Sequence, residues 1–236
     1  MQSSDVDKNV QHAPLHVSNV LQAEPLVSLE RDVLKPAQVS WFYSYWQRAL
    51  DIFAGLCGLL VLGILLLVLA PLLYLDSPGP IFYSQKRLGH RGRLFSIHKI
   101  RSMRTDAEQA GQPIWATATD ARVTRMGRFL RATHLDELPQ AVNILRGEMS
   151  LIGPRPERPE YVVELEKAHP LYRSRLLVKP GLTGWTQVQY GYGSSYQDEL
   201  IKLQYDLYYI EHQSCSLDIQ IILKTIVEVV IHHGDR

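Results

Sequence analysis

The chain has 236 residues, 46% of them hydrophobic, and its 25 basic and 24 acidic side chains leave a formal charge of +1. This length holds one catalytic domain and a membrane segment, and the near-neutral charge gives no reason to expect a nucleic acid as a partner. Two distant cysteines, Cys57 and Cys215, exclude a disulfide framework and a cysteine-based metal cluster.

The N-terminal third of the chain changes from polar to strongly apolar. Residues 1–40 lack a sustained hydrophobic period, which predicts a poorly ordered tail without a cleavable secretion signal. Residues 52–75 contain no charged side chain, and a helix over them is about 36 Å long, enough to cross a hydrocarbon core of about 30 Å. Aromatic residues crowd positions 41–46, where their rings favour the headgroup region. We therefore expect a membrane-embedded helix within residues 41–78.

A basic block follows this helix. Residues 86–104 carry seven Lys and Arg side chains and no acidic one. Such a block beside a membrane segment favours the cytoplasmic side, and it is attracted to anionic headgroups by roughly 1 kcal/mol per charge. A solvated face with only topological meaning is the alternative. We therefore expect residues 79–236 to form a domain at the cytoplasmic face of a membrane, with the lipid bilayer as a partner.

The remaining periodicity is mostly helical. Helices are predicted over residues 161–175, 198–210 and 217–232, and a loop or short strand over residues 179–189. The predicted fold class is mainly α with a few short β-strands.

Two adjacent acidic residues, Asp136 and Glu137, stand at the predicted start of another helix. Pro139 is tolerated only in a first helical turn, and Gly147 suits the position just past the last turn. Free N–H groups and the helix dipole favour negative charge there, which keeps a carboxylate ionised. Asp136 is thus a candidate nucleophile, and Glu137 a candidate ligand for a divalent cation. Acidic residues in a first turn are also common for purely stabilising reasons.

Two arginines flank this acidic pair. Arg155 stands between Pro154 and Pro156, so its backbone has little freedom to lose when a ligand binds, and its guanidinium matches phosphate oxygens. Arg131 precedes the helix and supplies a second positive charge, although an ordinary surface arginine is the commoner explanation for one such residue. Cations beside carboxylates suit phosphoryl transfer, which depends on charge neutralisation and alignment.

Five motifs carry a resemblance to a known family. They are residues 79–85 (GPIFYSQ), 99–103 (KIRSM), 135–140 (LDELPQ), 149–156 (MSLIGPRP) and 180–185 (PGLTGW). With these motifs in this order, the chain from about residue 45 onward resembles the bacterial sugar transferases, which are monotopic polyprenyl-phosphate phosphoglycosyl transferases. Residues 190–193 and 203–210 are similar to the branch that starts exopolysaccharide repeat units.

The resemblance implies a two-step reaction. Asp136 attacks the sugar-bearing phosphorus of a UDP-sugar and releases UMP, and undecaprenyl phosphate then takes the phosphosugar from the aspartyl intermediate. By the same matching, Mg²⁺ is the cofactor, bound by Asp136 and Glu137. By this matching the phosphate-binding residues are Arg131, Arg155, Lys99 and Arg101. Asp206 is one further candidate for the site. For Asp206 a solvated polar face of its helix is an equal alternative.

The sequence departs from the family in its membrane helix. Many members break this helix with a Ser-Pro pair so that it leaves on the face it entered, whereas this chain has Gly63-Ile64 at that spacing and Pro71 further on. Neither residue forces re-entry, so a re-entrant helix is expected from the resemblance alone. A catalytically silent scaffold for polysaccharide assembly and a nucleotide-sugar hydrolase are the alternative functions. Neither the sugar nor a homo-oligomeric state follows from the sequence.

Overall fold

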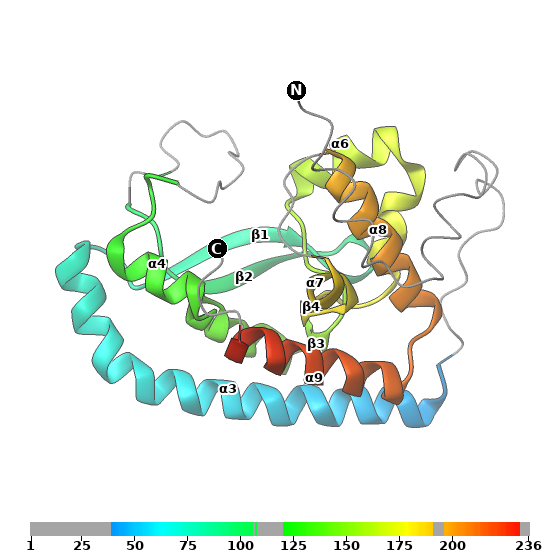
Figure 1. Ribbon diagram of the computed structural model, residues 1–236, viewed down its shortest axis with the longest axis horizontal. Coiled ribbons are helices and arrows are strands. Elements are labelled where there is room, and N and C mark those ends of the chain that lie inside the picture. The colour runs from blue at the N-terminus through cyan, green and yellow to red at the C-terminus, as the bar shows by residue number, and fades with distance from the viewer. Residues whose placement is uncertain (1–38, 106, 108–119, 191–195, 232–236) are drawn as a thin grey trace.

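The computed structural model describes residues 39–105, 107, 120–190 and 196–231, so most of the predicted tail at residues 1–40 lies outside the described part. The fold is mainly helical with two small sheets, as predicted (Figure 1). In chain order the elements are α3 (Trp41–Asp76), β1 (Phe82–Leu88), η2 (His90–Gly92), β2 (Leu94–Ile100), α4 (Arg125–Ala132), η3 (Leu135–Gln140), α5 (Ala141–Arg146), β3 (Ser150–Ile152), α6 (Pro159–Ala168), η4 (Pro170–Leu177), β4 (Gly181–Thr183), α7 (Trp185–Gln189), α8 (Tyr196–Glu211) and α9 (Cys215–Ile231).

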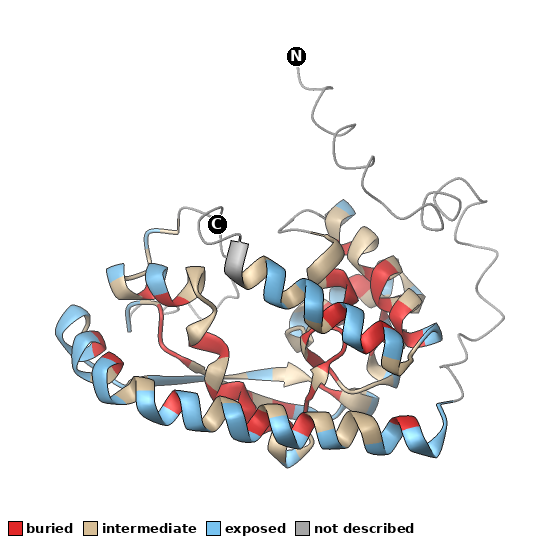
Figure 2. Cartoon of the chain, turned by 60° about the horizontal axis from the view of Figure 1, so that its bottom comes forward, coloured by how far each residue is buried: buried red, intermediate tan, exposed pale blue. Residues whose placement is uncertain are grey.

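Helix α3 is one continuous helix of 36 residues that runs along the underside of the domain (Figure 1). It includes the aromatic residues that were expected to precede it, and the side chain of Ser40 caps its first turn. In its most apolar window only 17% of the residues are buried, so most of its hydrophobic surface faces outward (Figure 2). Its inward positions recur at spacings of four and seven or eight, which is one stripe of a helix; they are Tyr43, Asp51, Gly55, Leu62, Leu69 and Leu73.

Both ends of α3 are bonded to the same domain. Near its start, the hydroxyl groups of Tyr43 and Tyr209 lie 3.4 Å apart. At its end, the Asp76 carboxylate accepts a hydrogen bond of 3.0 Å from the backbone N–H of Met126. The helix also continues through Gly63 and Pro71 without a turn. Both ends of α3 therefore lie on the side of the helix where the domain is, opposite its exposed apolar face.

A β-hairpin supports the acidic pair from one side. Strands β1 and β2 are antiparallel, with Tyr83 opposite Lys99, and β2 packs against η3. The fully buried Asn143 of α5 fastens β2 in place, because its side-chain amide donates to the Ser96 carbonyl at 2.8 Å and its oxygen accepts from the His98 N–H at 3.2 Å. This arrangement fixes the end of β2, where Lys99 lies.

Strands β3 and β4 form a parallel pair whose backbones approach closely. A Cβ atom on Gly153 would lie 2.4 Å from the Lys179 carbonyl oxygen, and one on Gly181 would lie 2.1 Å from the Gly153 nitrogen. No side chain fits at these separations. The glycines of the motifs at residues 149–156 and 180–185 are therefore explained by this pairing, which holds the segment that carries Arg155.

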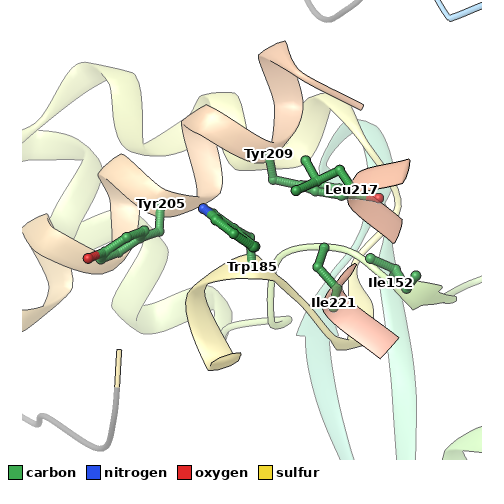
Figure 3. Close-up of a cluster of buried hydrophobic side chains, with 6 residues drawn as sticks. All are labelled: Ile152, Trp185, Tyr205, Tyr209, Leu217 and Ile221. Carbon is green, nitrogen blue, oxygen red and sulfur yellow. The ribbon is translucent and has the colours of Figure 1, made fainter. Parts of the chain in front are cut away.

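The predicted helix over residues 161–175 is wrong in one respect: it is two helices. Helix α6 ends at Ala168, and η4 begins at Pro170, because the residue before a proline is disfavoured in the helical conformation. His169 accordingly has an extended conformation (φ −138°, ψ 93°). The predicted helices over residues 198–210 and 217–232 correspond to α8 and α9, whose packing with α7 encloses Trp185 and Tyr209 in the largest apolar cluster (Figure 3).

Candidate active site

The acidic pair lies in the first turn of a 3-10 helix, η3, rather than of an α-helix. The α-helical hydrogen bonding begins only at α5, directly after Pro139 and Gln140. The backbone enters η3 through His134, which has a left-handed conformation (φ 57°). Gly147 ends α5, at the position predicted for it, and has a left-handed conformation (φ 77°). Asp136 and Glu137 are both buried by the surrounding elements, to 6% and 9% exposed.

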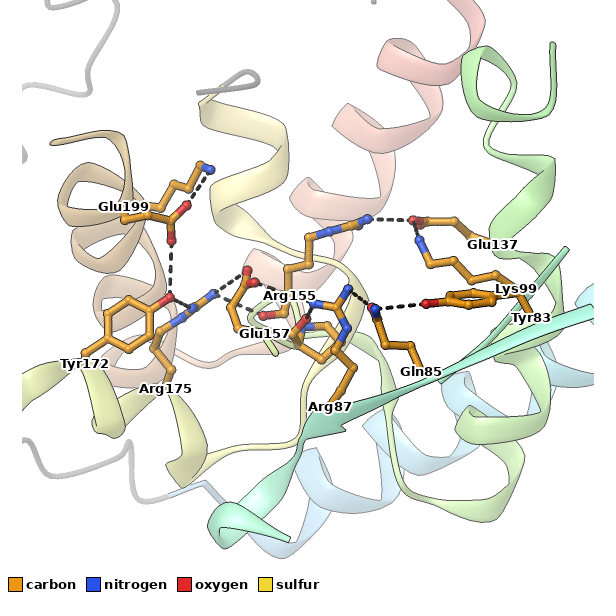
Figure 4. Close-up of polar contacts among 12 residues, drawn as sticks. Tyr83, Gln85, Arg87, Lys99, Glu137, Arg155, Glu157, Tyr172, Arg175 and Glu199 are labelled. Carbon is orange, nitrogen blue, oxygen red and sulfur yellow. Dashed lines mark hydrogen bonds and ion pairs between the residues drawn. The ribbon is translucent and has the colours of Figure 1, made fainter. Parts of the chain in front are cut away.

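Glu137 is held between two cations that come from different elements. Its Oε1 atom accepts a hydrogen bond of 2.7 Å from Lys99 Nζ on β2 and one of 2.6 Å from a guanidinium nitrogen of Arg155, just after β3 (Figure 4). Both bonds are charge-assisted, which makes them about twice as strong as neutral ones. The positive charges keep the pKa of the Glu137 carboxyl well below its usual range, although burial by itself would raise it. Glu137 is thus a permanently ionised anchor of the site.

The Asp136 carboxyl titrates differently from its neighbour. Burial raises the pKa of Asp136 to about 6, against the charges of Lys99 and Arg131, which lower it. The sequence had predicted that the start of a helix would favour the ionised form, but loss of solvent outweighs that effect here. At neutral pH the carboxylate is still mostly ionised, and among the described residues no hydrogen bond occupies it. It is therefore the more reactive of the two acidic groups.

The other predicted phosphate ligands divide into two groups. Arg131, on α4, donates a hydrogen bond of 2.9 Å from Nε to Ser102 Oγ, and its charge is close enough to lower the pKa of Asp136. The buried guanidinium of Arg101 instead donates to the backbone carbonyls of Ser77 and Pro78. The structure therefore brings Lys99, Arg131 and Arg155 to the acidic pair, and it uses Arg101 to fasten the segment that follows α3.

Asp206 lies in a second, buried polar network behind Arg155. Its carboxylate is 1% exposed, is 2.6 Å from Arg175 Nε, and accepts a hydrogen bond of 2.5 Å from Thr186 Oγ1. The alternative of a solvated polar face is thus wrong. Arg175 in turn donates a hydrogen bond of 3.1 Å to the backbone carbonyl of Arg155 (Figure 4). Asp206 is therefore connected to the segment that carries Arg155 through Arg175.

A further cation holds the same loop. Arg87 donates a hydrogen bond of 3.2 Å to the carbonyl of Pro156 and lies 3.7 Å from the Glu157 carboxylate. A small cavity of about 20 Å³ between this loop and η4 is lined by Arg155 and Arg175 among others, and Asp136 is not part of its lining. It has room for about one water molecule. This cavity is therefore too small to hold a substrate.

The acidic pair is also the expected place for a metal ion. Among the described residues no group of three or more His, Cys, Asp or Glu side chains is placed to hold a metal ion. Mg²⁺, however, is usually bound by one or two carboxylates together with waters and substrate phosphates. Asp136 and Glu137 are two carboxylates of this kind, next to each other in η3.

Comparison with known proteins identifies the family. The sequence profile described as bacterial sugar transferase matches residues 42–232. The chain belongs to the bacterial sugar transferase family. The chain is 42% identical over 194 residues to the UDP-N-acetylgalactosamine-undecaprenyl-phosphate N-acetylgalactosaminephosphotransferase of Aeromonas hydrophila, covering 82% of the chain and 46% of the relative. It is 42% identical over 182 residues to the UDP-glucose:undecaprenyl-phosphate glucose-1-phosphate transferase of Xanthomonas campestris pv. campestris, covering 76% of the chain and 38% of the relative.

The chain covers different fractions of the length of its relatives. The chain spans less than half of the two relatives just named, but it matches 93% of the exopolysaccharide production protein PSS of Rhizobium leguminosarum bv. phaseoli, at 38% identity over 190 residues. Two relatives named for different sugars, N-acetylgalactosamine and glucose, are equally similar to it. Overall similarity therefore does not select a sugar.

The structure adds residues near the site that the sequence did not reveal. Arg87 was read as part of a basic block with topological meaning, and Arg175 as part of a helix. Both instead hold the backbone of the loop that carries Arg155. Neither had a signal in the sequence, because an arginine that binds a distant carbonyl looks the same as a surface arginine.

Proposed function

We propose that this protein transfers a sugar 1-phosphate from a UDP-sugar to undecaprenyl phosphate and releases UMP, as the first step of exopolysaccharide or related glycan assembly. The observation that carries the proposal is the buried pair of unequal carboxyls, in which Glu137 is fixed by Lys99 and Arg155 and Asp136 is left available. The names of the relatives, which act on undecaprenyl phosphate, support the acceptor.

In the first step the Asp136 carboxylate attacks the sugar-bearing phosphorus of the donor. A bond forms between the carboxylate oxygen and phosphorus, and the bond from this phosphorus to the oxygen bridging to UMP breaks, so that UMP leaves with the electron pair. Arg155 and Arg131 neutralise the charge that develops on the phosphoryl oxygens. Lys99 holds Glu137 in place and adds to the positive field.

In the second step a phosphate oxygen of undecaprenyl phosphate attacks the same phosphorus. The bond to Asp136 breaks, the carboxylate is regenerated, and the product is a sugar linked to the lipid through a diphosphate. The acceptor is anionic, so the same arginines reduce its repulsion from the phosphosugar. Water is the competing nucleophile, and a lipid acceptor at the membrane surface is what separates transfer from hydrolysis.

We propose Mg²⁺ as the cofactor. Asp136 and Glu137 would hold it together with the donor diphosphate, and the ion would supply charge neutralisation on the phosphate oxygens. Glu137 is suited to this part because its pKa is low, so it stays ionised at any physiological pH.

The exposed side of α3 supports a membrane placement. Large apolar side chains cover this side along the whole helix, among them Phe53, Leu60, Leu67 and Leu75, which are 67–80% exposed. Since both helix ends are bonded to the catalytic domain, we propose that α3 is embedded from one face only, with the domain on the cytoplasmic side of the inner membrane.

The test is a donor panel on membranes that contain the protein. UDP-glucose, UDP-galactose and UDP-N-acetylgalactosamine are each supplied with undecaprenyl phosphate and Mg²⁺, and UMP and the lipid product are measured. The proposal expects UMP and lipid-linked sugar in equal amounts from at least one donor. UMP without a lipid product would indicate a hydrolase, and no UMP from any donor would indicate a scaffold.

A further inference from the structure

The last two charged residues before the apolar stretch, Arg48 and Asp51, are both turned toward the catalytic domain. They are three residues apart on α3 and so lie on one face of the helix. Asp51 is 2% exposed. A carboxylate this deeply buried is costly unless it is hydrogen-bonded, so its contacts indicate what it is for.

Asp51 holds the strand that leads to Arg155. Its Oδ1 atom accepts hydrogen bonds from Ser150 Oγ at 2.8 Å and from the backbone N–H of Leu151 at 2.7 Å. Strand β4 pairs with β3 through Ser150 and Ile152, so the Leu151 N–H points to the opposite edge. Asp51 thus accepts the hydrogen bond of a backbone N–H that would otherwise need a further strand as its partner.

Arg48 holds the helix that follows the acidic pair. Its guanidinium donates hydrogen bonds to the carbonyls of Ile144 (3.0 Å) and Leu145 (2.8 Å), in the last turn of α5. The last carbonyls of a helix have no partner within it, and the negative end of the helix dipole favours a cation there. Helix α5 continues directly from η3, so this bond acts on the segment that carries Glu137.

The backbones of α3 and α5 are also in close contact. One turn after Asp51, a Cβ atom on Gly55 would lie 2.7 Å from Leu145 Cγ, and one on Gly58 would lie 3.1 Å from the Ala141 Cβ. The two helices therefore pack closely at these glycines, where α3 meets the Leu145 side chain and Ala141 of α5. We expect a movement of α3 to displace α5 through these contacts.

We infer that Arg48 and Asp51 form a clamp, one turn of the membrane helix, that sets the position of Glu137 relative to Arg155. Glu137 belongs to the segment before the turn at Gly147, and Arg155 to the segment after it. Arg48 is bonded to the first segment and Asp51 to the second. The clamp couples the seating of α3 in lipid to the geometry of the site. Arg48 and Asp51 are positioning residues, and their catalytic effect rests on the function proposed above.

The test compares variants of the full chain in nanodiscs of phosphatidylethanolamine and phosphatidylglycerol. Asp51→Ala removes both acceptor contacts, Asp51→Asn keeps an acceptor for the Leu151 N–H, and Arg48→Met keeps the aliphatic stem without the donors. Tyr43→Phe is the matched control, because it removes a different hydrogen bond between α3 and the domain. UMP release is measured per folded enzyme with the donor selected in the panel.

For Asp51→Ala and Arg48→Met we expect the donor KM to rise about fivefold or more and kcat to fall about tenfold. Asp51→Asn should recover most of both, and Tyr43→Phe should match the wild type. A merely structural role lowers the amount of active enzyme and leaves the KM unchanged. The inference is overturned if Asp51→Ala keeps the wild-type KM and kcat, or if Tyr43→Phe shows the same losses.

Hydrogen exchange tests the clamp independently of activity. Asp51→Ala should speed amide exchange in residues 150–158, and Arg48→Met in residues 141–147, whereas Tyr43→Phe should change neither. This readout separates the two proposals: faster exchange in an enzyme that releases no UMP supports the clamp and refutes the function. Unchanged exchange in both variants refutes the clamp, whatever the activity.

Discussion

Glu137 and Arg155 are joined by a hydrogen bond of 2.6 Å although they come from different elements, one from η3 and the other from the loop after β3. Lys99 completes the contact from a third element, β2. The position of the acidic pair is therefore set by the tertiary fold. Substitutions of its partners are expected to change the rate, the pH profile or the stability in different ways.

Loss of Arg155 should affect the rate far more than the stability. Arg155→Ala is expected to lower kcat/KM for the donor about a hundredfold or more, as does removal of another stabiliser of transition-state charge. Arg155→Lys keeps the charge without the forked donor geometry, so its kcat/KM should lie between those of Arg155→Ala and the wild type. Arg146→Ala, at the exposed end of α5, serves as the control. An Arg155→Ala enzyme as fast as the control would mean that the donor phosphate lies elsewhere.

The raised pKa of Asp136 predicts an acid limb in the pH profile. Because the carboxylate is the reacting form and its pKa is about 6, log kcat/KM should fall by about one unit per pH unit below pH 6 and level off above it. Arg131 favours the ionised form, so Arg131→Met should move this limb to higher pH. Arg128→Met, exposed on the same helix, should leave the limb in place. A limb that stays fixed or moves to lower pH in Arg131→Met would exclude Asp136 as the titrating group.

The buried pair of Arg175 and Asp206 is expected to matter for both folding and donor binding. Arg175→Met leaves the Asp206 carboxylate buried without its cation, which typically lowers the free energy of unfolding by about 3–5 kcal/mol. Asp206→Asn keeps the contact to Thr186 and should destabilise less, while raising the donor KM because Arg175 holds the Arg155 backbone less firmly. Thermal unfolding and KM are the measurements. The control is Glu166→Gln, which breaks the exposed ion pair with Arg173 and should change neither the thermal stability nor the KM. If this variant lost as much as Arg175→Met and Asp206→Asn, the buried network would have no special role.

Removal of the metal should stop the reaction reversibly. Treatment with EDTA is expected to abolish UMP release, and added Mg²⁺ should restore it. Glu137→Gln should raise the Mg²⁺ concentration needed for half-maximal activity, because a neutral amide is a poorer ligand. Glu164→Gln, exposed on α6, should have the wild-type requirement. Full activity in EDTA would refute the metal proposal and leave Lys99, Arg131 and Arg155 to neutralise the charge.

The sequence predicted the elements better than their contacts. Gly147 marked the end of α5 because a local signal, its left-handed conformation, decides that position. The pairing of β3 with β4 was not predicted, since nothing near Gly153 indicates a partner about thirty residues away. The sequence indicated no role for Arg48 or Asp51, which lie just before the apolar stretch. Their roles depend on which face of α3 meets the domain, and this is settled by packing over the whole chain.

The measurement that tests the mechanism most directly is the intact mass of the protein after a brief incubation with the donor and Mg²⁺ in the absence of undecaprenyl phosphate. We predict a covalent adduct with the mass of one sugar phosphate, located on the peptide that contains Asp136, discharged by added undecaprenyl phosphate and absent in Asp136→Asn. An adduct that persists in Asp136→Asn, or wild-type turnover by that variant, would contradict the account.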